Sequence, residues 1–430
     1  MRQLPFTLAA MSESEKYFRA PRGTRDILPP ESFRWHEVLR RALESFALAG
    51  YAPIETPIFE HTEVFERGVG ESSDVVTKQM YTFTDRGGRS LTLRPELTAG
   101  VVRAVNEHGL ARGALPVKLA YAGPMFRQER PQKGRYRQFT QVGIEALGAE
   151  DPMIDAEVID VAVRFFSELG LATSLALNSI GHLDAGCRLG YNKVLVEFLD
   201  AHKDDLAPED RDRIESNPLR TFDSREPRTI EVMAGAPLIS DHLCTDCRSH
   251  FEGVRGLLDD IGIGYELQPR LVRGLDYYTR TTFEFMARGL GSQDAVGGGG
   301  RYDGLSEALG GPALTGIGFS LGVDRILLAL GDAIEAGPAI EVYVVALGDA
   351  ARREAFAIVT ALRHAGIGAD LDSLGRGMKG QMKNADRSGA RFAAIVGDEE
   401  LAAREVTLKD LESGYQERVP MDRLERRVRS

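Results

Sequence analysis

The segment MFRQERPQKGRYRQF, residues 125–139, is the stretch from which the rest of the sequence can be interpreted. Residues 127–137 carry five basic side chains and one acidic side chain, whereas the whole chain has 53 Lys and Arg against 64 Asp and Glu. The flanking residues, 117–127 and 137–147, have the composition of strands. The sequence therefore predicts two strands joined by a strongly basic loop.

Such a loop suits phosphate groups, because a guanidinium is always charged and can bind two oxygens at once. Arg127 lies at the base of the loop, and Arg135 and Arg137 lie on its far side. These residues predict a binding site for a polyphosphate or for the end of a nucleic acid. The alternative interpretation is an ordinary solvated turn, since basic turns are common on protein surfaces.

Composition sets the class of protein. A chain of 430 residues with 43% hydrophobic and 27% charged residues is typical of a globular protein with two or three domains. No apolar run approaches the roughly 18 to 20 residues of a membrane helix, so no membrane partner is expected. The net charge of −11 excludes nonspecific nucleic-acid binding through the overall field. Any contact with RNA must therefore be local.

Charge is unevenly divided along the chain. From residue 341 onward there are 15 Lys and Arg and 15 Asp and Glu, so that this part is neutral. Subtraction from the totals leaves 38 basic and 49 acidic residues in the first 340, a charge of −11. The basic loop therefore lies within an acidic part of the chain, which favours a specific anionic ligand over general electrostatic attraction.

Three cysteines provide no disulfide framework and suit a reducing cytosol, so we expect a cytoplasmic protein. Two of them, Cys244 and Cys247, form a single CxxC pair flanked by His242 and His250. The stretch is interpreted as one helix that runs to Leu258 and spreads these side chains over more than one face. With no second such pair in the sequence, we expect no metal bound by protein side chains, although zinc remains the alternative.

The strand after the basic loop alternates in polarity. Gln141 and Glu145 share one face, and Gly143 between them is expected to leave open space. The pattern predicts a pocket floor that carries an amide and a carboxylate. The alternative is a half-exposed strand with ordinary polar residues.

Three further stretches have side chains or backbone features that suit ligand binding. Arg273 precedes Gly274 and the pair Tyr277 and Tyr278, a combination that suits a ligand with an anionic group and a ring. Four glycines at 297–300 allow a flat ligand to approach the backbone closely, or else form a flexible loop.

Arg325 falls in the first turn of a predicted helix, residues 322–330, where its charge opposes the helix dipole. Such a placement favours an external anion, or a nucleotide on which the guanidinium stacks.

The last ninety residues change pattern. After a linker at 332–338, the sequence predicts strand, helix, strand, helix and strand, which is a small separate α/β domain. Within it, residues 375–380 fit GxGxxG, a dinucleotide fingerprint. The domain is shorter than a full dinucleotide-binding fold, and Lys379 and Lys383 make the following helix basic. A nicotinamide enzyme is therefore kept only as a minor alternative.

Taken together, the motifs resemble the class II aminoacyl-tRNA synthetases, and specifically the histidyl-tRNA synthetase family. Residues 126–145 are similar to motif 2 of that class, residues 316–326 to motif 3, and residues 57–70 to motif 1, the dimer-forming segment. Residues 271–285 (LVRGLDYYTRTTFEF) and 297–305 (GGGGRYDGL) resemble two signatures peculiar to the histidine enzymes. The likeness extends from about residue 18 to about residue 424.

The resemblance implies an α+β fold: a class II antiparallel sheet flanked by helices, with a helix-rich insertion at about 190–260. It implies a catalytic domain at 18–335 and a C-terminal α/β anticodon-binding domain at 340–430. Residues 1–17 lie outside the resemblance and are expected to form an N-terminal tail. The implied substrates are L-histidine, ATP with Mg²⁺, and tRNA(His), and the implied assembly is a homodimer. The implied reaction is ligation of histidine to tRNA(His) through a histidyl-adenylate, with release of pyrophosphate and AMP.

The resemblance also implies roles for individual residues. It assigns catalysis to Arg127 and Arg273, histidine binding to Glu96, Thr98, Arg127, Gln141, Glu145, Arg273, Tyr277 and Tyr278, ATP binding to Arg127, Glu129, Arg135 and Arg325, and contact with the tRNA acceptor end to Gln132, Lys133 and Arg137. The closest rival is the regulatory subunit of ATP phosphoribosyltransferase, a relative that does not charge tRNA. Relatives of that kind generally lack the C-terminal domain and degrade the histidine signatures, and this chain has both.

Overall fold

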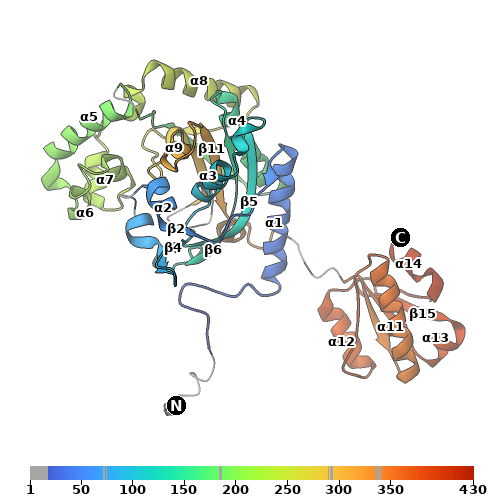
Figure 1. The fold of residues 1–430 in the computed structure, drawn as a ribbon. Coiled ribbons are helices and arrows are strands. Elements are labelled where there is room, and N and C mark those ends of the chain that lie inside the picture. The colour runs from blue at the N-terminus through green and yellow to red at the C-terminus, as the bar shows by residue number, and fades with distance from the viewer. Residues whose placement is uncertain are drawn as a thin grey trace, which may run out of the picture. The chain divides into compact units, whose positions relative to one another are not determined.

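The computed structural model describes residues 18–70, 73, 75–183, 186–288, 290, 294–334, 337 and 340–430. The chain divides into two compact units, with the boundary between residues 334 and 335 (Figure 1). The expected tail at 1–17, and most of the second half of the linker predicted at 332–338, lie outside the described residues. Within the described part, no helix has the length and apolar character needed to cross a membrane.

An eight-stranded sheet forms the centre of the first unit. Its strands are β1 (Ala52–Pro53), β5 (Val117–Phe126), β6 (Gln138–Leu147), β7 (Thr173–Ser179), β8 (Glu266–Leu267), β9 (Thr279–Ala287), β10 (Ala295–Arg301) and β11 (Gly316–Gly322). They lie in the order β1-β5-β6-β11-β10-β9-β7-β8. All neighbouring pairs are antiparallel except β1–β5 and β7–β8 at the two edges.

The basic loop joins β5 and β6, so the predicted pair of strands is confirmed. The glycine run is not a flexible loop, because Gly297–Gly300 lie within β10. Strands β9 and β11 pack so closely on both sides that a Cβ at Gly298 would overlap the carbonyl of Phe283, and one at Gly299 would overlap that of Gly318. Only glycine fits at these positions of the central strand, which leaves its surface flat there.

Three helices cover one part of the sheet: α1 (Glu31–Leu48), α4 (Pro152–Glu168) and α10 (Val323–Leu330). Helix α4 begins at Asp151, whose carboxylate accepts the amide of Met153 at 2.8 Å, and proline at the first helical position fits this start. Phe46 of α1 makes edge-to-face ring contacts with Phe165 and Phe319 at 5.6 and 5.5 Å between centroids. These rings join the helices to β11 in a close-packed core.

A small sheet and short helices form another part of the first unit. Strands β2 (Phe59–His61), β3 (Tyr81–Thr84) and β4 (Ser90–Leu93) pair in the order β2-β4-β3, and β3 and β4 form a hairpin. The helices are α2 (Thr62–Val69), a π-helical turn (Val75–Gln79), α3 (Thr98–Glu107), a 3₁₀ turn (Leu110–Arg112) and α9 (Leu305–Ala308). Helix α3 starts only at Thr98, so Glu96 precedes it.

The described residues between β7 and β8 form mainly helices. They comprise α5 (Arg188–Ala201), α6 (Pro208–Arg211), α7 (Pro227–Met233) and α8 (Thr245–Asp260), with 3₁₀ turns at Lys203–Asp205, Pro218–Asp223 and Ile239–His242. These elements share a core of their own, which includes Tyr191, Leu195 and Leu199 of α5. The same core reaches Val272 and Tyr278, so the helical region packs directly on the segment before β9.

The second unit is a five-stranded sheet in the order β13-β12-β14-β15-β16. Its elements are β12 (Val342–Ala346), α11 (Asp349–His364), β13 (Ala369–Leu371), α12 (Met378–Ser388), β14 (Phe392–Val396), α13 (Asp398–Ala403), β15 (Glu405–Asp410), β16 (Gln416–Pro420), a 3₁₀ turn (Met421–Arg423) and α14 (Leu424–Val428). The predicted strand and helix order holds as far as β14. The antiparallel strands β15 and β16 were not predicted, and they make the sheet mixed.

Candidate active site

A cavity of about 240 Å³ opens over the central strands of the large sheet. It is lined by residues of β6, β10 and β11, of the β5–β6 loop, of the start of α3 and of the segment before β9. The predicted site residues that line it are Glu96, Thr98, Arg127, Glu129, Arg135, Gln141, Arg273, Tyr277, Tyr278 and Arg325. The fold thus brings together residues that lie more than 200 positions apart in the sequence.

Arg127 and Arg135 face each other across one carboxylate. An Nη1 atom of each lies near Glu129, at 4.0 Å for Arg127 and 3.8 Å for Arg135. Arg127 is held by its Nε, which donates to the carbonyl of Pro95 at 2.9 Å, and it stacks over the ring of Phe139. Burial lowers the pKa of Arg127, because a buried cation lacks solvation. One acid between two guanidinium groups leaves this wall positive.

Arg273 lies on the wall formed by the segment before β9. Its Nη1 donates to Glu284 of β9 at 2.8 Å, and its guanidinium lies 5.9 Å from the ring centre of Tyr278. Burial lowers its pKa, but Tyr278 and Glu284 together raise it above the ordinary value. A Cβ at Gly298 would stand 2.9 Å from Nη1, so the glycine strand makes room for this guanidinium.

Arg325 is in the first turn of α10, as predicted, and its Nε donates to the carbonyl of Ala295 at 2.5 Å. Burial lowers its pKa, and the positive charge of Arg135 lowers it further. A buried cation with a second cation beside it marks a place where an anion is stabilised.

Glu96 and Gln141 supply the acceptors of the cavity. The Glu96 carboxylate caps α3 by accepting the amides of Thr98 at 2.7 Å and Ala99 at 3.0 Å, while burial raises its pKa. The Oε1 of Gln141 is buried and has no hydrogen-bond partner among the residues that the structure describes. A buried acceptor without a partner is costly, so it indicates a ligand that donates a hydrogen bond there.

Glu145 differs from its prediction, because it does not line the cavity. The space expected over Gly143 is filled by Tyr121, whose Oη would lie 2.5 Å from a Cβ at that glycine. The Glu145 carboxyl is fully buried and accepts hydrogen bonds from Thr98 Oγ1 and Tyr302 Oη, both at 2.6 Å. Burial raises its pKa to about 8, although the hydroxyl groups lower it. The pocket-floor interpretation was right for Gln141 and wrong for Glu145.

Three tyrosine rings contact one another along the cavity. Tyr277 lies 4.8 Å from Tyr278 and 5.8 Å from Tyr302 between ring centres. Tyr302 was not assigned to the site, although it belongs to the quoted GGGGRYDGL stretch. Its Oη connects the cavity to Glu145, which lies behind it. The signal that could have found it is its position two residues after the glycine strand, where a phenol beside an open surface is available to a ligand.

Sequence reasoning also missed an ion pair at the cavity edge. Arg25 donates to Asp324 at 2.9 Å and to Glu31 at 2.7 Å, and its guanidinium lies 4.6 Å from the ring centre of Tyr136. Asp324 also accepts the amide of Thr140 at 3.3 Å. These contacts tie the N-terminal segment, the basic loop and α10 together, and no local pattern in the sequence connects them.

The residues assigned to the tRNA acceptor end lie outside the cavity lining. Gln132 and Lys133 are exposed in a tight turn closed by the bond from the Gln132 amide to the Arg135 carbonyl, 3.1 Å. Arg137 is half-buried, and its Nε donates to the carbonyl of Glu129 at 3.2 Å. Arg137 therefore braces the loop, and Gln132 and Lys133 form its exposed tip.

Comparison with known proteins identifies the family. The sequence profile described as histidyl-tRNA synthetase matches residues 23–326, and the profile of the anticodon binding domain matches residues 341–430. The chain belongs to the histidyl-tRNA synthetase family. Histidine--tRNA ligase of Corynebacterium kroppenstedtii is 53% identical and covers 97% of this chain and 98% of that protein. That of Nocardia farcinica is 54% identical, over 94% and 96%.

Solved structures agree with this membership in the histidyl-tRNA synthetase family. The apo histidyl-tRNA synthetase of S. aureus aligns with a TM-score of 0.80 at 40% identity, covering 96% of this chain and all of that one. A Bacillus halodurans structure described as an ATP phosphoribosyltransferase regulatory subunit/histidyl-tRNA synthetase aligns with a TM-score of 0.65 at 23% identity, which shows a shared fold alone. The predicted family and the predicted α+β fold class are confirmed.

Proposed function

We propose that this chain ligates L-histidine to tRNA(His) in an ATP-dependent reaction that passes through a histidyl-adenylate. The single observation that carries the proposal is the double character of the cavity. Arg127, Arg135 and Arg273 give some parts of the cavity wall a positive charge. Glu96 and the unpartnered Oε1 of Gln141 give another part hydrogen-bond acceptors. An amino acid bound beside a polyphosphate needs both kinds of site. The curated relatives of the same length carry the corresponding name.

In the first step, an oxygen of the histidine carboxylate attacks the α-phosphorus of ATP. The bond from that phosphorus to the bridging oxygen breaks, and pyrophosphate leaves with its electron pair. The nucleophile is already ionised, so no side chain has to remove a proton. We assign Arg127 and Arg273 the stabilisation of charge that builds on the phosphate oxygens, and Glu129, Arg135 and Arg325 the ATP contacts.

Mg²⁺ is proposed to accompany ATP, as the family implies. Carboxylate oxygens are the protein ligands that Mg²⁺ prefers, and Glu129 is the carboxylate on the arginine wall. Its contacts with Arg127 and Arg135 are long, at 4.0 and 3.8 Å, so a cation could replace part of them. The metal would neutralise part of the negative charge of the phosphates.

Substrate selection is assigned to both ends of histidine. The ammonium group would donate to Glu96, Gln141 and the Thr98 hydroxyl, which satisfies the unpartnered Gln141 acceptor. The imidazole would meet the phenols of Tyr277 and Tyr278, and Tyr302 would link it to Glu145. A phenylalanine ring would leave those polar groups unpaired, which is the costly kind of mismatch.

In the second step, a ribose hydroxyl at the 3′ end of the tRNA attacks the adenylate carbonyl and AMP leaves. The tip of the basic loop, Gln132 and Lys133, is assigned to the acceptor end, with Arg137 as its brace. We assign anticodon contact to the second unit, whose profile match is to an anticodon binding domain. Lys379, Lys383 and Arg387 of α12 provide the basic surface for it.

A homodimer is proposed through the small sheet. Ile58, Phe59 and Phe83 are each more than 40% exposed, and the rings of Phe59 and Phe83 lie 6.4 Å apart. Exposed apolar side chains grouped on a sheet indicate a protein interface. Ile58 and Phe59 belong to the segment that resembles motif 1, the dimer-forming segment of the class. This supports a second copy of the chain as the partner.

We also propose the domain division as 18–335 and 340–430, which the separation of contacts at residues 334 and 335 supports. A cytoplasmic location is proposed from the three cysteines, none of which is in a disulfide.

The decisive experiment is histidine-dependent exchange of pyrophosphate into ATP, followed by charging of tRNA(His). We expect both activities, with histidine preferred over phenylalanine by at least about 10⁴-fold. A regulatory, non-charging relative would fail the charging assay with any tRNA. Charging of a different tRNA would refute the assignment to histidine.

A further inference from the structure

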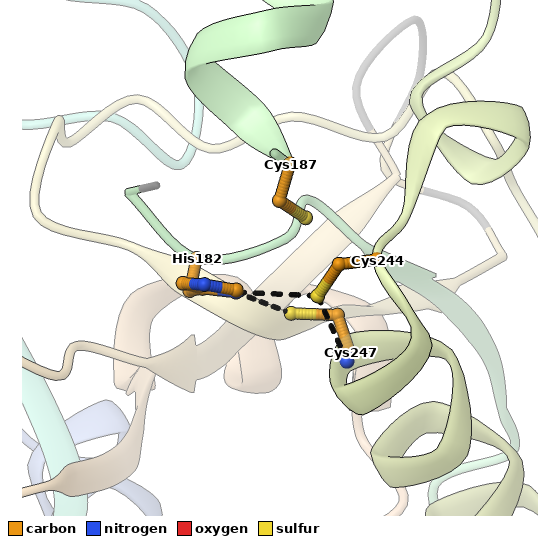
Figure 2. A group of neighbouring side chains, drawn as sticks. All are labelled: His182, Cys187, Cys244 and Cys247. Carbon is orange, nitrogen blue, oxygen red and sulfur yellow. Dashed lines mark hydrogen bonds between the residues drawn. The ribbon is translucent and has the colours of Figure 1, made fainter. Parts of the chain in front are cut away.

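Four potential metal ligands meet away from the cavity, between the end of β7 and the start of α8. Figure 2 shows His182, Cys187, Cys244 and Cys247 turned toward one another. Their ligand atoms all lie within 4.8 Å of one another. His182 Nδ1 lies 2.8 Å from Cys247 Sγ and 3.7 Å from Cys244 Sγ. Cys187 and Cys247 are buried.

Both premises of the sequence argument against a metal fail here. Cys244 is not on the face of a helix, because α8 starts at Thr245 and Cys244 occupies the position before it. A second pair of ligands does exist, and it comes from His182 and Cys187, about 60 residues earlier in the chain. Only the tertiary fold brings the H-x4-C pair to the C-x2-C pair.

The two histidines that flank the CxxC in sequence do not belong to the cluster. The ring of His242 packs on Tyr191, with 5.4 Å between centroids. His250 is turned toward Asp155, with 3.6 Å between Nε2 and Oδ2. The metal ligands are therefore a different set from the one the local sequence suggested.

The spacing of the four atoms fits a small tetrahedral ion. With Zn–S of about 2.3 Å and Zn–N of about 2.0–2.1 Å, tetrahedral geometry separates two sulfurs by roughly 3.8 Å and a sulfur from a nitrogen by roughly 3.6 Å. The distance of 3.7 Å from His182 Nδ1 to Cys244 Sγ already matches, and that of 2.8 Å to Cys247 Sγ would lengthen as an ion enters.

Two helices begin at the cluster. Cys187 occupies the position before α5 and Cys244 that before α8, so two helices of 14 and 16 residues begin at the site. The amide of Cys247 donates to Cys244 Sγ at 3.4 Å. The partial positive charge at a helix start is a favourable neighbour for the anionic ligands of a metal ion.

We propose that His182, Cys187, Cys244 and Cys247 bind one structural zinc ion. Three thiolates and one imidazole form a set that is typical of structural zinc, because soft sulfur ligands select this metal over magnesium or calcium. All four positions are filled by protein atoms, so no ligand position remains for a substrate and the ion takes no part in bond chemistry. It links the loop after β7 to the helical region that ends in α8.

The link reaches the cavity through two short paths. Arg188, next to Cys187, donates to the carbonyl of Tyr278 at 2.5 Å. Gly181, next to His182, accepts the amide of Arg280 at 2.8 Å. Loss of the ion should therefore loosen the Tyr278 segment, and this second consequence rests on the proposed role of that segment in histidine binding.

The test begins with the full-length chain, produced without a metal-affinity tag and purified under reducing conditions. Elemental analysis should find about one zinc per chain. Chelation followed by addition of Co²⁺ should give the intense visible absorption of tetrahedral thiolate coordination. Cys244→Ser and His182→Gln should each weaken zinc binding by at least about 10- to 100-fold, whereas His242→Gln, a matched histidine outside the cluster, should keep its zinc.

Several results would overturn the proposal. One is a reduced apoprotein that retains no zinc after incubation with Zn²⁺. Another is zinc that persists in both Cys244→Ser and His182→Gln. A disulfide between two of the cysteines in the reduced preparation, found by mass spectrometry, would also overturn it. If the variants fail to fold, zinc titration of the chelated wild-type chain decides the question. These readouts are independent of histidine activation, so they separate the fate of this proposal from that of the synthetase function.

Discussion

The sharpest consequence of the structure concerns the buried carboxyl of Glu145. Burial raises its pKa from 4.5 to about 8, so the folded protein holds a proton there that the unfolded chain has already lost at neutral pH. A shift of about 3.5 units corresponds to about 5 kcal/mol, at 1.36 kcal/mol per unit. The sign follows from linkage: the folded state binds more protons, so stability falls as pH rises from 4.5 to 8.

Glu145→Gln removes this titration and keeps the shape of the protonated side chain. The glutamine amide can still bond to the hydroxyl groups of Thr98 and Tyr302, which both accept and donate. Between pH 5 and pH 8, the free energy of unfolding of the variant should therefore gain about 4 kcal/mol relative to the wild type. Other titrating groups affect both proteins equally and cancel in the difference.

Trp35 provides the assay, because it is the single tryptophan of the chain and lies in α1 of the first unit. Its fluorescence during denaturant unfolding, measured at several pH values, reports on that unit alone. Glu231→Gln, at an exposed position of α7, serves as the control that changes the same chemical group. Parallel pH profiles for wild type and Glu145→Gln would refute the reasoning and would show that Glu145 is ionised in the folded protein.

Three further predictions concern activity and assembly. Arg273→Ala should fold normally and lose at least about 10²-fold in histidine activation, measured by pyrophosphate exchange, and near-normal exchange would exclude its proposed role. A chain that ends at Ile334 should still form histidyl-adenylate but charge tRNA far more slowly, with the deficit shrinking at higher salt because the full chain makes more salt-sensitive phosphate contacts; loss of adenylate would show that the second unit completes the site. Phe59→Asp should shift the mass in light scattering toward a monomer, whereas Phe356→Asp, at an even more exposed phenylalanine of the second unit, should not. An unchanged dimer in Phe59→Asp would place the interface elsewhere.

The sequence by itself determined the elements that local patterns encode. Charge density marked the β5–β6 loop, and alternation marked the two strands that flank it, because both signals lie within a few residues of each other. Motif resemblance, which depends on residue order alone, led to the family and to most of the charged residues that line the cavity. Strand ends and helix starts were less certain, as α3 shows, since capping by Glu96 depends on where its carboxylate points.

Tertiary structure decided what depends on contacts between distant segments. The pattern of the strand predicted open space over Gly143, but Tyr121 of the neighbouring strand fills that space. Glu145 is therefore buried behind the cavity and does not line it. The single CxxC gained its partners only when the loop after β7 reached the start of α8. In each case the deciding neighbour is far along the chain, where side-chain period and composition carry no information about which segments will pack together.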